Sequence, residues 1–155
     1  MDAENTHQVF EWLWSSGQLS EGDIRSLPSH GISAVINLAL PTSSNALPGE
    51  AELVTRHGMA YVQIPVEWEN PKPEEFLQFV GVLNAFAGRK LWVHCAKNMR
   101  VSAFIYLYRK LVLSEADEQA SIPMRHLWSP NETWQAFIHE VCAAYSDHSL
   151  QARRP

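Results

Sequence analysis

The chain has 155 residues, of which 46% are hydrophobic and 19% charged, a composition typical of one globular domain. Its 17 acidic and 12 basic residues give a formal net charge of −5, which argues against a duplex-DNA-binding protein that neutralises phosphates. The 2 cysteines cannot build a disulfide framework or a four-thiolate zinc site, and they leave room for one functional thiol.

The sequence shows no targeting signal or membrane span. Residues 1–8 are polar and lack the apolar run of a secretory signal. The strongly apolar stretch 101–113 is interrupted by Ser102, Arg109 and Lys110, and it is shorter than the roughly 20 residues that a membrane span needs. We therefore expect a soluble, cytoplasmic protein in a reducing compartment, with neither a membrane nor a nucleic acid as its partner.

The first predicted elements are a capped helix and a buried strand. Ser20 followed three residues later by Asp23 predicts a helix start, and the helix should run to about Ser29 and end at Gly31. Residues 33–38 form a short, nearly all-apolar run with β-branched side chains. Such runs are typical of strands that are buried on both faces of a sheet.

The alternation of helix and strand continues. Residues 39–47 are rich in turn-forming side chains and predict a loop. Pro48 opens a second helix that should end at Gly58, because proline favours helix starts and glycine favours helix ends. Residues 60–65 then predict another short strand, and residues 67–72 a loop between prolines.

A third helix begins at Glu74 and ends before Gly88. Its apolar side chains recur at helical spacing and form one stripe: Phe76, Phe79, Val80, Leu83 and Phe86. Residues 91–94 predict the next buried strand. Strands that alternate with helices in this way favour an α/β fold, with a mostly parallel central sheet and helices on both faces.

The remainder of the chain is predicted to be helical. Residues 101–113 are apolar nearly all round, which indicates a central buried helix. A weaker helix should cover about 116–127, and a last helix about 131–145, with Asn131 as its cap. The apolar stripe of the last helix includes Cys142, which we interpret as a core residue.

We expect one domain. No internal repeat or flexible linker divides the chain, so residues 1–14 are assigned to an N-terminal segment, 15–147 to a single domain and 148–155 to a flexible tail. In parallel sheets of this type, ligands bind beyond the carboxyl ends of the strands. This rule points to the loop that follows Val93.

That loop carries the side chains for phosphate chemistry. Cys95 follows a buried strand and precedes a buried helix, so the loop amides and the positive end of the helix would face a bound anion. Lys97 and Arg100 add positive charge that favours the thiolate, and the arginine fork matches two oxygens of a phosphate. The pattern is typical of a nucleophilic thiolate that attacks phosphorus.

The run from His94 to Ser102 resembles the active-site loop of the cysteine-dependent protein tyrosine and dual-specificity phosphatases, whose motif is His-Cys, five residues, Arg, then Ser or Thr. Other parts of the chain look like a compact bacterial branch of these proteins: residues 16–20, 31–38, 64–66 and the helix after Arg100. The resemblance covers roughly residues 15–145. It implies a fold of the dual-specificity phosphatase type, with His94 orienting the loop.

The loop departs from that motif in length. Four residues separate Cys95 from Arg100 instead of five, so two alignments are open. Either the loop is one residue shorter and Arg100 is the usual arginine, or Val101 fills the arginine position. In the second alignment Ser102 keeps the hydroxyl that assists departure of the thiolate in the family. Asn98 occupies a position where such loops often have glycine, and asparagine tolerates left-handed backbone angles.

A phosphatase of this type also needs a proton donor for the leaving group. In the family this is usually an aspartate about thirty residues before the cysteine. Glu67 and Glu69 lie 28 and 26 residues before Cys95, on a loop bracketed by prolines. Glu67 directly follows Ile-Pro-Val and is the first choice, with Glu69 second. Trp68 lies between them and is expected to line or cover the cleft.

The sequence thus predicts a cysteine-dependent phosphomonoester hydrolase that acts through a thiophosphoryl-cysteine intermediate. The predicted substrate-binding residues are His94, Trp68 and the loop residues Ala96, Lys97, Asn98 and Met99. The partner would be a phosphorylated small molecule or a phosphoprotein, and no metal or organic cofactor is needed. The alternatives are a non-catalytic phosphate- or phosphoprotein-binding relative and, less favoured, a rhodanese-type sulfurtransferase.

Overall fold

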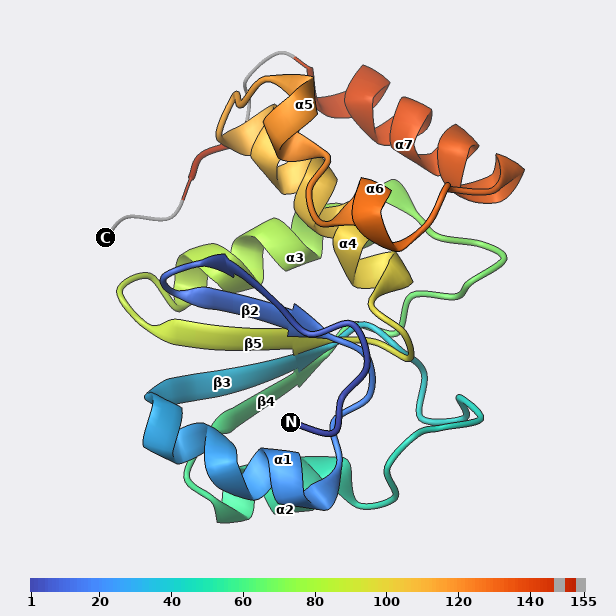
Figure 1. Cartoon of the computed structure of the whole chain (residues 1–155). Coiled ribbons are helices and arrows are strands. Elements are labelled where there is room, and N and C mark those ends of the chain that lie inside the picture. Colours follow the sequence, from blue (N-terminus) through green and yellow to red (C-terminus); the bar gives the residue numbers. More distant parts are fainter. Residues whose placement is uncertain (147–149, 153–155) are drawn as a thin grey trace.

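The computed structural model describes residues 1–146 and 150–152, and its centre is one five-stranded sheet (Figure 1). The strands lie in the order β1-β2-β5-β3-β4. Neighbours β2, β5, β3 and β4 run parallel, and β1 pairs antiparallel with β2. The strands are β1 (His7–Phe10), β2 (Leu13–Ser16), β3 (Ile32–Asn37), β4 (Ala60–Gln63) and β5 (Lys90–His94). This mostly parallel sheet confirms the expected fold class.

Helices cover both faces of the sheet (Figure 1). On one face lie α1 (Glu21–Ser26) and α2 (Glu50–Arg56). The other face carries α3 (Pro73–Ala85), α4 (Met99–Leu107) and, packed on these, α7 (Glu132–Tyr145). The short helices α5 (Asp117–Ala120) and α6 (Met124–Leu127) contact α4. No described helix is long and apolar enough to cross a membrane.

The expected helix signals are present where the sequence places them. The Ser20 hydroxyl caps α1 by accepting from the Asp23 amide, and the Asp23 carboxylate accepts from the Ser20 amide, which completes a capping box. The chain continues as a 3-10 turn (η1, Leu27–His30) and leaves it at Gly31, whose φ of 78° suits glycine. Asn131 caps α7 by accepting from the Trp134 amide.

Three features differ from the sequence prediction. Residues 1–14, which we assigned to an N-terminal segment, contain β1 and the start of β2. They belong to the sheet, because β2 pairs with β5 and β1 pairs with β2. The helix predicted over 101–113 begins at Met99 and ends in a π-helical turn, η2 (Tyr108–Val112). The helix predicted over 116–127 is two short helices, divided before Pro123, which has no backbone N–H to continue a helix. The expected tail falls largely outside the described residues.

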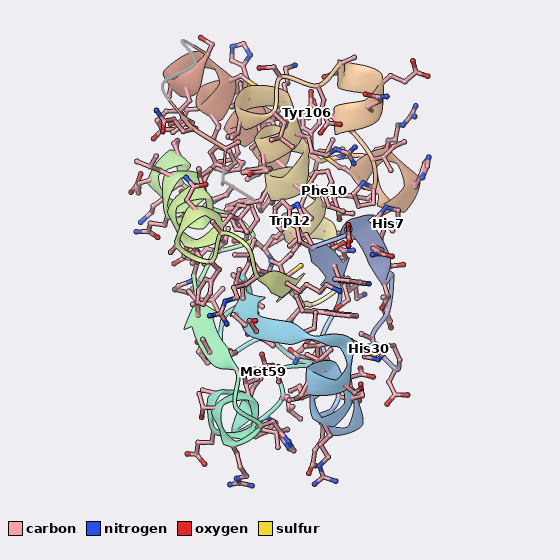
Figure 2. All side chains as sticks on the ribbon, turned by 90° about the vertical axis from the view of Figure 1, so that its left-hand side faces the viewer. His7, Phe10, Trp12, His30, Met59 and Tyr106 are labelled. Carbon is pink, nitrogen blue, oxygen red and sulfur yellow. The ribbon has the colours of Figure 1, made fainter. Side chains whose placement is uncertain are left out.

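The core consists of two layers, one on each face of the sheet. The larger layer joins the sheet to α3, α4 and α7, and its buried aromatic side chains include Phe76, Phe104 and Trp134. The smaller layer joins the sheet to α1 and α2 and includes Met59 and Trp92. Figure 2 shows Phe10 and Trp12 on the α4 side of the sheet and Met59 near α2.

The register of the central strands brings their carboxyl ends together. Ser16 of β2 and Asn37 of β3 both lie opposite His94, the last residue of β5. The next residue is Cys95, so the loop predicted to carry the chemistry starts at the carboxyl edge of the sheet, between two neighbouring strands. Ligand sites of parallel sheets lie at this edge.

Candidate active site

The Cys95 loop connects β5 to the central helix α4. The Cys95 side chain is buried, and its amide donates to the Ser16 carbonyl at 3.3 Å. Asn98 is the residue before α4 and has a left-handed φ of 66°. Asparagine adopts this conformation more readily than most residues, which explains how the loop turns without glycine. The buried thiol therefore precedes the first residue of α4 by four positions.

A glycine lets a second segment lie against this loop. Gly17 follows β2 and forms an isolated bridge with Lys97, and the neighbouring Gln18 amide donates to the Ala96 carbonyl at 3.0 Å. A Cβ at Gly17 would lie only 2.7 Å from that same carbonyl oxygen. The close approach therefore needs glycine at position 17, and it fixes the first half of the Cys95 loop.

The N-terminal segment holds the other half of the loop. The Asn98 side chain is buried, and its Nδ2 donates to the Asn5 carbonyl at 2.8 Å and to Ser15 Oγ at 3.0 Å. In return, Asn5 Nδ2 donates to the Lys97 carbonyl at 3.0 Å. These bonds join residues more than eighty positions apart, and nothing in the sequence pattern indicated them. The Asn98 side chain is thus an anchor of the loop, pointing toward the N-terminal segment.

Arg100 reaches from α4 to the loop that carries the predicted proton donor. Its side chain is buried, and its Nη1 donates to the Val66 carbonyl at 2.9 Å. Val101, the alternative arginine position, packs its side chain into the larger core layer. The guanidinium therefore contacts the backbone directly before residue 67.

The loop of Glu67 is held on both sides of that residue. The Val66 carbonyl accepts from Arg100, and the Trp68 carbonyl accepts from Trp134 Nε1 at 2.9 Å. The Glu67 and Glu69 side chains are exposed, and neither carboxylate has a hydrogen-bond partner within the described part of the chain. The backbone is thus held on both sides of Glu67, whereas its carboxylate is exposed.

Three tryptophans pack around this loop and connect it to α4. The Trp68 ring lies 5.3 Å from the Trp128 ring and 5.6 Å from the Trp134 ring, measured between centroids. Trp128 Nε1 donates to Ser102 Oγ at 3.0 Å, and the Ser102 hydroxyl donates to the Met99 carbonyl at 2.8 Å. To reach a returning thiolate, this hydroxyl would have to turn away from Met99. Trp68 is partly exposed, as a residue at a cleft would be.

His94 has a partner that sequence reasoning missed. Its ring is fully buried, with Nδ1 3.1 Å from the Cys95 carbonyl oxygen and Nε2 2.6 Å from Glu50 Oε2. Glu50 is the first residue of α2 and is itself buried. The only sequence signal was an acidic residue in the first turn of a predicted helix, which is common at exposed positions.

The remaining predicted residues surround the loop. Lys97 is exposed, and Ala96 and Met99 are half-buried. The Ala96 carbonyl also accepts from Asn45 Nδ2 at 3.1 Å, so the 39–47 loop touches the site. Cys142 is half-buried on α7, where burial raises the pKa of its thiol. Within residues 1–146 and 150–152, no three His, Cys, Asp or Glu side chains are grouped as metal ligands.

Similarity to known proteins agrees with this geometry. Residues 2–139 match a family described as a DSP-PTPase phosphatase fused to NAD+ kinase. The chain belongs to this phosphatase family. A candidate phosphatase (DUF442) from Shewanella putrefaciens CN-32 is 37% identical, with a TM-score of 0.82 over 93% of this chain and 95% of that chain. No curated protein matches the chain.

More distant phosphatases share the fold. PTPMT1, in complex with PI(5)P, is 14% identical to this phosphatase-family chain, with a TM-score of 0.74 over 91% of this chain and 96% of that chain. TpbA of P. aeruginosa, in complex with pTyr, is also 14% identical, with a TM-score of 0.70 over 92% and 91% of the two chains. At this identity the likeness concerns the fold alone.

Proposed function

We propose that the protein is a cysteine-dependent phosphomonoester hydrolase that acts through a thiophosphoryl-cysteine intermediate. The observation that carries this proposal is the Arg100–Val66 hydrogen bond of 2.9 Å. It joins the loop of the buried thiol to the loop of the predicted proton donor. A nucleophile, an anion-binding arginine and an acid on neighbouring loops are the groups that a phosphate monoester requires.

In the first step, the Cys95 thiolate attacks the phosphorus atom. An S–P bond forms, and the bond from phosphorus to the leaving oxygen breaks with its electron pair on that oxygen. Glu67, with Glu69 as second choice, gives its proton to the leaving oxygen. Arg100 and the loop amides of residues 96–100 stabilise the charge on the other phosphate oxygens.

In the second step, water attacks the phosphorus of the intermediate. The carboxylate of Glu67 takes a proton from the water, the S–P bond breaks, and inorganic phosphate leaves. Ser102 is proposed to stabilise the returning thiolate after its hydroxyl turns. All protons and electron pairs balance within these groups, so the cycle needs no metal and no organic cofactor.

The substrate is proposed to be a phosphorylated small molecule or a phosphoprotein. PI(5)P and pTyr are bound by the PTPMT1 and TpbA structures that share this fold, and both present a phosphate monoester. In this chain Lys97 is exposed and Trp68 is partly exposed, and we propose that both contact the remainder of such a molecule. We place a phosphate over the Cys95 loop, with its leaving oxygen toward Glu67.

The test is hydrolysis of p-nitrophenyl phosphate by the wild type, Cys95→Ser and Cys142→Ser. We expect Cys95→Ser to lose turnover and Cys142→Ser to retain it, because Cys142 lies on α7 away from the loop. Equal rates for wild type and Cys95→Ser would refute the proposal. Binding of vanadate without hydrolysis of any phosphate monoester would instead favour the phosphate-binding alternative.

A further inference from the structure

Glu50 is a buried carboxylate that the proposed reaction does not use. It is only 6% exposed, although it stands at the start of a seven-residue helix. Its Oε2 contacts His94 Nε2 at 2.6 Å, and its Oε1 accepts from Gln18 Nε2 at 2.5 Å. Burying a carboxylate is costly unless charge and hydrogen bonds compensate for the lost water, so this pair calls for a role.

The partners of His94 determine the protonation of its ring. Nε2 faces the Glu50 carboxylate, and Nδ1 faces the Cys95 carbonyl at 3.1 Å. A carbonyl oxygen and an ionised carboxylate can only accept hydrogen bonds. With Glu50 ionised, both contacts can be hydrogen bonds only if both ring nitrogens carry a proton.

The surroundings of Glu50 favour its ionised form. Burial acts to raise the pKa of Glu50, but the hydrogen bond and charge of His94, with further hydrogen bonds from Gln18 and Tyr61, hold the pKa below its ordinary value. Burial, together with the Glu50 carboxylate, raises the pKa of Tyr61 to about 12, so this phenol stays neutral. Asn37, the other neighbour, donates to Tyr61 at 3.0 Å and carries no charge.

We propose that Glu50 is a positioning residue of the catalytic centre: through a buried ion pair it keeps His94 doubly protonated, and the charged ring stabilises the Cys95 thiolate. This inference rests on the proposed function of Cys95 as nucleophile. The ring contacts the backbone carbonyl of Cys95 itself. A neighbouring positive charge favours the ionised thiol.

The test removes the negative charge of Glu50 and keeps the shape of its side chain. In Glu50→Gln the side-chain carbonyl can still accept from His94 Nε2, but no negative charge remains to hold the second proton on the ring. Iodoacetate, an anion that the loop should attract, then reports the thiolate, with Cys142 in the same sample as an internal reference. Glu52→Gln is the matched control, because Glu52 lies on the same helix and is exposed.

We expect Glu50→Gln to slow alkylation of Cys95 at pH 6 by about tenfold, the effect of one lost neighbouring charge on the ionised fraction. At pH 10 the alkylation rates of Cys95 in the wild type and in Glu50→Gln should be equal, because Cys95 is then ionised in both proteins. Glu52→Gln should match the wild type at both pH values. Glu50→Asp keeps the charge and should recover most of the rate at pH 6, which a role in shape alone would not explain.

A slow rate at pH 10 as well, or equal rates at pH 6, would overturn the inference. A measurement on the wild type avoids any folding defect of the variants: ¹⁵N NMR at pH 7 should show both ring nitrogens of His94 protonated, and a ring with one bare nitrogen would overturn the inference too. These readouts need no turnover. Absence of hydrolysis by the wild type would therefore refute the proposed function without deciding the role of Glu50.

Discussion

The substitution Trp134→Phe removes the hydrogen bond that holds one side of the Glu67 loop and keeps an aromatic ring in the core. Trp134 is fully buried, and its Nε1 is the donor to the Trp68 carbonyl at 2.9 Å. The Val66 carbonyl still has Arg100, so the loop would be released at one end only. We therefore expect a loop that is loosened near Glu67 in a protein that still folds.

The loss of stability that we expect for Trp134→Phe has two contributions. The Trp68 carbonyl loses its donor, and because this bond is only partly buried the cost should be about 1 kcal/mol. The smaller ring leaves space among Trp68, Trp128 and Phe137, whose rings lie within 5.2 to 6.1 Å of the Trp134 ring, and this costs roughly 1–2 kcal/mol. The free energy of unfolding should fall by about 2–3 kcal/mol in urea denaturation.

The catalytic effect should depend on the leaving group. A misplaced proton donor matters most when the leaving oxygen is a poor leaving group, so we expect kcat on phenyl phosphate to fall about tenfold and kcat on p-nitrophenyl phosphate much less. Phe137→Leu is the control for packing. Phe137 contacts the Trp134 ring at 5.2 Å and the Phe104 ring at 5.5 Å and is not hydrogen-bonded through its side chain.

Phe137→Leu should lose similar stability and keep the wild-type ratio of the two rates. If Trp134→Phe is destabilised to the same extent and also keeps that ratio, the indole hydrogen bond does not position Glu67. A fall in both rates by the same factor would also contradict this prediction, because it would place the defect in a step that the two substrates share, such as phosphate binding or hydrolysis of the intermediate, instead of in protonation of the leaving oxygen.

Three further predictions concern the loop and its supports. Gly17→Ala should lower the free energy of unfolding by about 2 kcal/mol, because the new Cβ would lie 2.7 Å from the Ala96 carbonyl; a urea midpoint equal to that of the wild type would show that the loop gives way freely. Asn98→Ala should lower the free energy of unfolding by about 2–3 kcal/mol, because alanine disfavours the φ of 66° at this position and two side-chain hydrogen bonds are lost. Asn98→Gly also loses the hydrogen bonds but tolerates this φ, so its loss should be about 1 kcal/mol smaller. Equal urea midpoints for the two variants would contradict the contribution assigned to the backbone angle. Burial acts to raise the pKa of Asp23, but hydrogen bonds from Ser20 and from the amides of residues 2 and 3 hold this pKa below its ordinary value of 3.8. The ionised carboxylate therefore stabilises the fold above pH 3.8, and this stabilisation is lost as the pH falls through the lower pKa of the folded state. The difference in melting temperature between wild type and Asp23→Asn should therefore be largest at pH 6 and shrink toward pH 3, and a constant difference would contradict the pKa direction.

Most of the elements could be predicted because their signals are local. The capping box of Ser20 and Asp23, the turn at Gly31 and the apolar stripe of α3 each depend on residues within a few positions of one another. Strands β1 and β2 were missed because a strand depends on its partner more than on its own sequence. The partner of Leu13 is Leu91, far away in the sequence.

In the candidate site, too, the residues of one local motif could be predicted, whereas contacts between distant segments could not. The proposed nucleophile and arginine lie within one short segment, so a single motif predicted both, and the spacing of Glu67 made it a candidate for the acid. The two possible arginine alignments could not be separated by spacing, since both fit the same letters. The fold places the Arg100 guanidinium against Val66 and the Val101 side chain in the core, which supports the shorter loop.

By itself, the sequence determined the alternating order of helices and strands and indicated the loop of Cys95 as the candidate for phosphate chemistry, because periodicity, caps and a compact motif are properties of neighbouring residues. Only the tertiary structure decided which distant groups meet. Glu50 reaches His94 across 44 residues, and Arg100 reaches Val66 across 34. Such pairs depend on the register of parallel strands and on the packing of helices against them, and no local pattern encodes those distances.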